Sequence, residues 1–398
     1  MNVKRPHAMI AGGGLAGPCL ANGLRRAGWE VTLFERDRGA ATRGQGYRIY
    51  IEPEGDLALR ACLPADLYQL ALATSGRRGS GVTILDPELH VLQHFAFDGA
   101  AEAGSNGGGH LTVDRLALRQ VLMAEIEGDV RYGAEVTGYE VLPGKGVRAL
   151  LAGGSSVEGD VLIGADGPSS RIRTQLLPGA VVVDTGLRAI FGKVPLTEEV
   201  RERTPEAVLN GFSTVVGADG RFMPLAAHRF RTDPAEAAAR LHPGVTFSDT
   251  RDYVMWVLGL PAARTGGDQE LFSLDGRAQL DLVLGQLGDW HPDIAAAVGR
   301  SDPATVTATT LRTSVPVEPW ASGPVTLIGD AIHCMIPSGI GAAVALRDAA
   351  LLALRLTEAQ AAGTSLVGAI HSYEREMLVY GFEAVAASQR MGQSMSTS

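Results

Sequence analysis

The first forty residues alternate apolar and polar blocks in an order that predicts a strand, a tight turn, a helix and a second strand. An apolar run at 8–11 enters the glycine-rich turn 12–17, and helical apolar spacing follows to Ala27. A second apolar run, 31–34, ends at Glu35. This order is typical of the first βαβ unit of a dinucleotide-binding domain, whereas the glycine string alone would equally fit an ordinary turn.

Each polar or glycine position of this unit has a physical role in dinucleotide binding. Gly12 allows the sharp turn, Gly14 lets the backbone approach a pyrophosphate, and Gly17 lets the helix lie close to the strand. The free N–H groups and the positive dipole end of the helix favour phosphate. The Glu35 carboxylate at the strand end can accept hydrogen bonds from ribose hydroxyls and would oppose a 2′-phosphate, so FAD or NAD is expected rather than NADP.

Further along the chain, apolar spacing predicts helices and strands that separate into two lobes. Helical spacing over 56–72 is broken at Pro64, and a hairpin is expected over 81–98. The other expected elements are a helix over 115–126, strands over 130–132, 136–142, 147–151, 161–163 and 325–329, an antiparallel sheet with a helix at 278–287 within 180–317, and long helices over 342–361 and 366–391.

The order of these elements predicts a nucleotide-binding domain that is interrupted by a strand-rich, substrate-binding lobe. The strand at 325–329 should return to the sheet of the first βαβ unit. The expected boundaries are 1–75, 108–178 and 318–362 for the nucleotide domain, 76–107 and 179–317 for the lobe, and 363–398 for a C-terminal helix.

Composition excludes several classes of function. The 398 residues are 45% hydrophobic and 20% charged, which suits roughly two to three domains with a large core. The net charge is −9 without a basic run, so nucleic acid and anionic membranes are not expected partners, and no protein partner is evident. Three scattered cysteines and the lack of a long apolar stretch or signal peptide predict a cytoplasmic protein.

Other reactive side chains lack the context that chemistry would need. Cys334 would need a base across space before it could act as a nucleophile, and nothing in the sequence specifies one. His90 and His94 lie in a strand-like segment without a carboxylate ligand pattern, so no metal site is expected.

Three further segments complete a pattern with the glycine turn. Residues 113–122 open a helix, and 164–173 follow a strand with the sequence GADGPSSRIR. The segment 325–341, VTLIGDAIHCMIPSGIG, places Asp330 at a strand end, where open α/β sheets bind ligands. Its glycine loop leads to a helix start near Ala342, whose positive end could stabilise negative charge on a reduced flavin. On the residues alone, Asp330 could also be a helix or turn cap.

Together these motifs resemble those of the class A FAD-dependent monooxygenases, the para-hydroxybenzoate-hydroxylase-like family, and are similar to its tetracycline-degrading and polyketide-tailoring members. The resemblance implies an α/β fold: a Rossmann-like FAD-binding domain of the GR2 type, an antiparallel-sheet substrate domain and C-terminal helices. It also implies a DG motif at Asp166–Gly167, with Ser170 and Arg173, and a GD motif at Gly329–Asp330.

The resemblance further implies which residues bind FAD and which could line the substrate pocket. Arg43, Gln45 and Gly46 match the loop that passes the flavin ring, and Arg115 matches a phosphate or ribityl contact. The implied FAD-binding set is Gly12, Gly14, Leu15, Ala16, Gly17, Glu35, Arg36, Arg43, Gln45, Gly46, Arg115, Asp166, Gly329, Asp330, Pro337, Gly339, Gly341 and Ala342. The candidates for the pocket are Tyr47, Arg48, Met223, His228 and Tyr253.

The activity that the resemblance implies is single-component monooxygenation, as in antibiotic biosynthesis. NADPH or NADH would reduce FAD, O2 would form a C4a-hydroperoxyflavin, and a small aromatic or polyketide-like substrate would be hydroxylated in an apolar pocket. No proton-transfer residue is assigned. A FAD-dependent reductase or dehydrogenase on the same fold, or a flavin-binding protein without turnover, stays open as an alternative.

Overall fold

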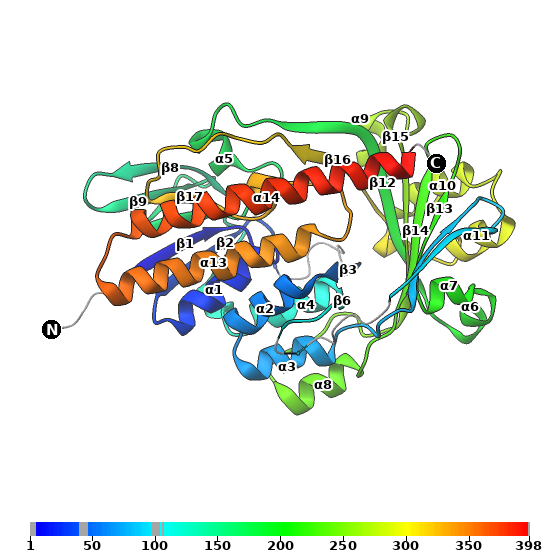
Figure 1. Cartoon of the computed structure of the whole chain (residues 1–398), viewed down its shortest axis with the longest axis horizontal. Coiled ribbons are helices and arrows are strands. Elements are labelled where there is room, and N and C mark those ends of the chain that lie inside the picture. The colour runs from blue at the N-terminus through cyan, green and yellow to red at the C-terminus, as the bar shows by residue number, and fades with distance from the viewer. Residues whose placement is uncertain (1–4, 40–46, 98–103, 106, 397–398) are drawn as a thin grey trace.

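The computed structural model describes residues 5–39, 47–97, 104–105 and 107–396, with two lobes that are each built on one sheet (Figure 1). The first sheet is five-stranded and parallel, in the order β17-β11-β1-β2-β7. It contains the expected βαβ unit, with α1 (Ala16–Arg26) between its first two strands. The strands are β1 (His7–Ala11), β2 (Glu30–Glu35), β7 (Val130–Tyr132), β11 (Val161–Gly164) and β17 (Val325–Leu327).

Burial explains why these short apolar runs form a parallel sheet. Every residue of β11 and β17 is buried, as expected for strands that are covered on both faces. The helix α1 packs on the sheet, and an antiparallel meander packs against β1 and β11. The meander strands are β8 (Val136–Leu142), β9 (Gly146–Leu151) and β10 (Ser156–Gly159).

The second lobe is built on a seven-stranded sheet in the order β16-β12-β15-β14-β13-β4-β5. All neighbouring strands are antiparallel except β4 and β13, which pair in parallel. The expected hairpin over 81–98 is confirmed by the β4–β5 pair. The strands are β4 (Gly81–Leu85), β5 (Val91–Ala96), β12 (Val182–Pro195), β13 (Phe212–Val216), β14 (Phe222–His228), β15 (Tyr253–Pro261) and β16 (Thr307–Ser314).

The period of two along β15 divides its side chains between two faces of this sheet. Val254, Trp256 and Leu258 belong to a core that the helices α9 (Asp268–Ser273), α10 (Gly276–Gln286) and α11 (Pro292–Val298) cover. Tyr253 and Met255 belong to a separate cluster on the other face. The predicted helix at 278–287 is therefore confirmed as α10, and the face that carries Tyr253 is the one that meets the first lobe.

Two long antiparallel helices, α13 (Gly341–Ala362) and α14 (Leu366–Ser396), confirm the expected C-terminal pair (Figure 1). The helix α13 packs on α1 and on α2 (Pro53–Cys62). The far end of α14 reaches the second lobe, where Gln389 Nε2 donates a 3.1 Å hydrogen bond to Thr313 Oγ1 in β16. The helix α14 therefore ties the two lobes together.

A small two-stranded antiparallel sheet lies between the lobes. It pairs β3 (Arg48–Ile51) with β6 (Leu111–Asp114), and β3 was not expected from the sequence because its four residues carry no clear period. Within the described ranges, no helix combines the length and apolar character needed to cross a membrane. The remaining helices are α3 (Ala65–Ala73), α4 (Arg115–Met123), α5 (Arg171–Leu176), α6 (Glu198–Arg203), α7 (Glu206–Leu209), α8 (Pro234–Leu241) and α12 (Asp330–His333).

Candidate active site

The glycine turn at the end of β1 lies directly against the segment that follows β11. Gly12 has a φ of +116°, and a Cβ there would collide with the Ala165 carbonyl, so only glycine fits this position. A Cβ at Gly17 would collide with the Gly12 carbonyl. A Cβ at Gly14, by contrast, would meet nothing within 4 Å. Gly12 and Gly17 are therefore required by the protein's own packing, while the space beside Gly14 is open to a ligand.

The Glu35 carboxylate at the end of β2 holds the turn in place. It accepts a 3.0 Å hydrogen bond from Gly13 N–H and a 2.9 Å hydrogen bond from Asp37 N–H. Arg119 in α4 donates to the Gly13 carbonyl at 2.5 Å and lies 3.4 Å from Glu35 Oε2. Arg119 was not expected at the site from the sequence, where only its i+4 spacing from Arg115 on one helix face could have suggested it. Arg36, beside Glu35, is exposed.

The segment after β11 has a carboxylate with a free oxygen near the glycine turn. Asp166 Oδ2 accepts a 2.9 Å hydrogen bond from Arg171 N–H, whereas Oδ1 is buried without a partner among the described residues. Desolvation raises the pKa of Asp166, although hydrogen bonds to its carboxylate, including the one from Arg171 N–H, act in the opposite direction. Arg173 donates to the carbonyls of Pro168 at 2.9 Å and Ala331 at 2.8 Å, and so joins this segment to α12.

Segments from the N-terminal and C-terminal parts of the chain meet at Gly329, which follows β17. A Cβ there would lie 3.6 Å from the Ala16 Cβ at the start of α1 and 3.2 Å from the Ala345 Cβ in the first turns of α13. Asp330 follows, and its side chain is exposed although surrounding protein desolvates it enough to raise its pKa. His333 and Arg115 act against that increase. A carboxylate that is both accessible and desolvated is expected inside a hollow that a ligand can enter.

A buried network lies behind Asp330. Asp348 Oδ2 lies 2.6 Å from His333 Nε2 and accepts a 2.6 Å hydrogen bond from Gly329 N–H. Asp348 Oδ1 accepts a 2.6 Å hydrogen bond from Tyr380 O–H in α14. Burial opposes the charged form of His333, but Asp348 more than offsets burial and raises the His333 pKa. Nothing in the sequence indicated this positioning network, because His333 and Asp348 lie in separate segments that no motif connects.

Other residues of the implied FAD-binding set lie along the loop that leads into α13 or outside the described residues. Gly339 lies against Tyr50, because a Cβ on Gly339 would be 3.7 Å from the Tyr50 Cβ, and Gly341 begins α13. Pro337 is exposed, and Ala342 is half-buried in the first turn of the helix. Arg43, Gln45 and Gly46 lie outside the described residues.

These residues fit FAD on four structural observations. No described side chain caps the N-terminus of α1 or of α13, so their free N–H groups are available to phosphate or to an anionic flavin. The position beside Gly14 is open, and Asp166 has a buried oxygen without a partner. Asp330 makes no capping hydrogen bond, because Gly329 is the N-cap of α12. Its carboxylate is thus available to accept hydrogen bonds from a ligand.

Four of the five pocket candidates gather between the lobes, next to this region. Tyr47 packs edge-on against Phe191 at 4.8 Å, and the His228 ring stacks on Tyr253 at 5.3 Å. Arg48 is on β3, and its backbone lies opposite that of Asp114 in the β3–β6 register, without a side-chain contact between the two among the described interactions. Met223, however, is 0% exposed in the core with Trp256 on the helix-covered face of the seven-stranded sheet. The structure therefore does not bring Met223 together with the other four.

A buried ion pair that the sequence analysis missed joins the two lobes at this point. Lys193 Nζ in β12 lies 2.7 Å from Asp114 Oδ2 at the end of β6, and both side chains are buried. Tyr253 O–H donates to the same oxygen at 2.8 Å. Burial opposes ionisation of Asp114, but Lys193 and the N–H of Ala117 lower its pKa overall. Asp114 thus holds three elements of the two lobes in register.

The other reactive side chains have ordinary structural partners. Burial raises the pKa of the Cys334 thiol to about 12, which keeps it protonated and unreactive. His90 lies 3.0 Å from Asp86, and His94 lies 3.0 Å from Thr83. No metal-binding group of side chains occurs among the described residues.

Comparisons with known proteins agree with this geometry. A family model for an FAD binding domain matches residues 288–388. The dual O-methyltransferase/FAD-dependent monooxygenase CTB3 of Cercospora beticola is 33% identical over 379 residues, covering 89% of this chain and 42% of that protein. The aurachin C monooxygenase/isomerase of Stigmatella aurantiaca is 30% identical over 391 residues, covering 97% of this chain and 88% of that protein. The chain spans about two fifths of the length of the dual-function relatives.

Solved structures show the same fold. A Photorhabdus luminescens protein assigned as an FAD-containing monooxygenase superposes with a TM-score of 0.82 at 28% identity, covering 98% of each chain. Klebsiella pneumoniae HpxO, in complex with FAD and uric acid, superposes with a TM-score of 0.75 at 20% identity, covering 98% of this chain and 89% of HpxO.

Proposed function

The chain belongs to the family of FAD-dependent monooxygenases, and on this premise we propose that it uses NADH or NADPH together with O2 to add one oxygen atom to an aromatic or polyketide-type small molecule. The observation that carries the proposal is the contact of Gly329 with both Ala16 and Ala345. This close approach brings together the glycine turn, the GD segment and the N-termini of α1 and α13, which no described side chain caps.

The residues that meet around Gly329 would hold FAD in a fixed orientation. The backbone beside Gly14 and the start of α1 would bind the pyrophosphate, and Asp330 would accept hydrogen bonds from the ribityl hydroxyls. The start of α13, at Ala342, would place its N–H groups against the flavin ring. When bound, FAD supplies the redox chemistry by which O2 gives one oxygen atom to the substrate and one to water, while NAD(P)H is oxidised.

The substrate would lie between the lobes, where aromatic side chains limit access of water. Tyr47 and Phe191 form one aromatic contact there, and Tyr253 and His228 form a second. An apolar, enclosed site favours oxygen transfer over loss of peroxide to water. Relatives named zeaxanthin epoxidase support oxygen insertion into an organic substrate in the wider family.

The test is a screen of NADH and NADPH oxidation by the FAD-loaded protein against a panel of aromatic polyketides, with product masses measured under isotope-labelled O2. We expect one class of compound to stimulate oxidation and to gain one labelled oxygen atom. Stimulated oxidation with a product that lacks the label would instead support a reductase or dehydrogenase. FAD binding without oxidation by any compound would support a flavin-binding protein without turnover.

A further inference from the structure

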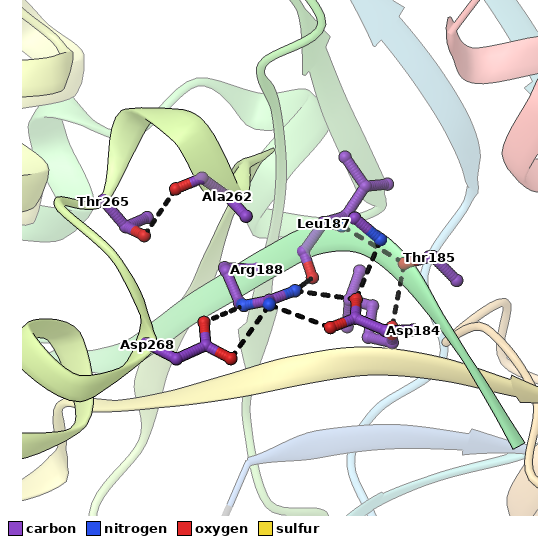
Figure 2. A network of polar contacts seen from close by, with 9 residues as sticks. Asp184, Thr185, Leu187, Arg188, Ala262, Thr265 and Asp268 are labelled. Carbon is purple, nitrogen blue, oxygen red and sulfur yellow. Dashed lines mark hydrogen bonds and ion pairs between the residues drawn. The ribbon is translucent and has the colours of Figure 1, made fainter.

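The buried arginines in the described part of the chain have oxygen acceptors, with one exception. Five described arginines are less than 10% exposed: Arg48, Arg119, Arg173, Arg188 and Arg221. Arg188 shows the usual arrangement, because its guanidinium contacts the carboxylates of both Asp184 and Asp268 (Figure 2). Arg221 likewise contacts Asp219 and Asp289, while Arg119 and Arg173 donate to carbonyls. Such partners offset the cost of removing a cation from water.

Arg48 has no such acceptor within the described part of the chain. The residue is 9% exposed, and its Nε is buried without a hydrogen-bond partner. Its guanidinium carbon lies 5.9 Å from the centre of the Phe212 ring, an interaction that leaves the N–H donors unused. A buried guanidinium with free donors is costly unless an anion occupies the neighbouring space.

The polar residues around Arg48 do not compensate its charge. Asp114 is already paired with Lys193 at 2.7 Å. Burial lowers the pKa of His228 to about 3 and raises that of Tyr253, so both are neutral near pH 7. Burial also lowers the Arg48 pKa, to about 10, which still leaves it protonated. Among the described residues, no carboxylate is therefore left to compensate the positive charge of Arg48.

The position of Arg48 places this charge beside the candidate flavin loop. Arg48 and Tyr50 are two residues apart in β3 and so lie on one face of the strand. Tyr50 lies against Gly339 of the loop that leads into α13. Tyr47 and Phe212, which are only half-buried, lie close to the same site and offer aromatic surface to a ring.

Resting on the function proposed above, we propose that Arg48 binds the substrate through a negatively charged oxygen, so that the substrate class is aromatic rings with an ionised hydroxyl or carboxylate. Tyr47 and Phe212 would contact the ring of that substrate. Arg48 is a specificity-determining residue in this proposal, and no step of oxygen transfer depends on its titration.

The experiment compares binding of an acid and its neutral ester to FAD-loaded protein by calorimetry, without a reductant. The probes are 1-hydroxy-2-naphthoate and its methyl ester, which differ by one negative charge. We expect the wild type to bind the acid about ten- to a hundredfold more tightly, as expected for one charge-assisted hydrogen bond. Arg48→Gln should abolish this preference, and Arg48→Lys should retain part of it. Arg188→Gln, which removes an equally buried but paired arginine, should leave the preference unchanged.

Several outcomes would overturn the proposal. The wild type could bind the acid and the ester equally well, or it could bind neither probe. Alternatively, an Arg48→Gln protein that retains FAD could still prefer the acid as strongly as the wild type does. An effect of Arg48→Gln confined to the KM for NADH or NADPH would assign the guanidinium to the phosphates of the reductant instead. Turnover of neutral compounds only would leave the proposed function intact and reject the role of Arg48. Arg48-dependent binding of the acid without any turnover would support the role of Arg48 and reject the proposed monooxygenase function.

Discussion

The imidazole of His333 and the carboxylate of Asp348 lie 2.6 Å apart, and both side chains are completely buried. Asp348 also accepts hydrogen bonds from Gly329 N–H and from Tyr380 O–H. One carboxylate thus connects the turn after β17, the short helix α12 and the C-terminal helix α14. A Cβ on Gly381 would lie only 2.7 Å from His333 Cδ2, so α14 also closes over the imidazole. This network holds Gly329 and the start of α12 in place, and so positions Asp330 from behind.

Removing the carboxylate of this network should destabilise the whole protein. Asp348→Ala would leave a buried imidazole, a hydroxyl and an N–H without their acceptor, a loss of about 3–5 kcal/mol in the free energy of unfolding. Glu358→Ala, in the same helix, removes an exposed partner of Arg355 and should cost less than about 1 kcal/mol. Urea denaturation of the three proteins measures both effects. Equal stabilities of the two variants would contradict the network.

The glycine turn allows folding and cofactor binding to be separated with matched substitutions. Gly12→Ala places a Cβ at positive φ against the Ala165 carbonyl and should cost more than about 2 kcal/mol of stability. The Cβ that Gly14→Ala adds would have no protein atom within 4 Å, so the free energy of unfolding should change by less than about 1 kcal/mol. Its methyl group would instead occupy the path of the pyrophosphate and should weaken FAD binding by about tenfold or more. Chemical denaturation and FAD titration of the apoprotein measure these effects; unchanged FAD affinity in Gly14→Ala would refute the placement.

The carboxylate of Asp330 should contribute directly to FAD affinity. Asp330→Asn keeps the size of the side chain but removes charge-assisted hydrogen bonds of about 1.5–3 kcal/mol, which corresponds to about ten- to a hundredfold weaker binding. Flavin fluorescence during titration measures the dissociation constant. Asp275→Asn, at the N-cap of α10, serves as the control because it perturbs a helix start in the other lobe. Equal FAD affinity in the Asp330 and Asp275 variants would limit Asp330 to a structural role.

Acid should destabilise the protein partly through His228. Burial lowers the pKa of His228 to about 3, against about 6.5 for an unfolded chain. Between these values the unfolded state binds a proton that the folded state does not. Stability therefore falls as pH falls below about 6.5, by up to about 1.4 kcal/mol per pH unit, and is independent of this group at higher pH.

The variant His228→Gln should have a shallower loss of stability between pH 6 and pH 4 than the wild type, since it removes the titrating group. Met223→Leu, a conservative change in the same strand, should retain the wild-type slope and controls for altered packing. Urea denaturation at several pH values supplies the slopes. Parallel curves for the wild type and His228→Gln would show that the His228 imidazole binds a proton as readily in the folded state as in the unfolded state, and so would contradict the lowered pKa.

The sequence by itself determined those elements whose formation depends only on residues close together in the chain. The order of apolar run, glycine turn and helical spacing at 8–35 specified the βαβ unit, because strand and helix periods and glycine geometry depend on neighbours in the chain. The hairpin at 81–98 and the helices α13 and α14 could be predicted for the same reason. The short helix α12 and the strand β3 could not, since four residues are too few to show a period.

Only the tertiary structure decided which distant residues meet. The contact of Gly329 with Ala16, the His333–Asp348 pair and the Lys193–Asp114 bridge each join segments far apart in the chain, and no spacing rule connects them. From the sequence, Arg48 and Met223 were both candidates for the substrate pocket. The alternation of β14 turns Met223 into the core, while the packing between the lobes leaves Arg48 without an acceptor among the described residues. Whether a buried charge is compensated depends on every element around it, and a chain pattern does not contain that information.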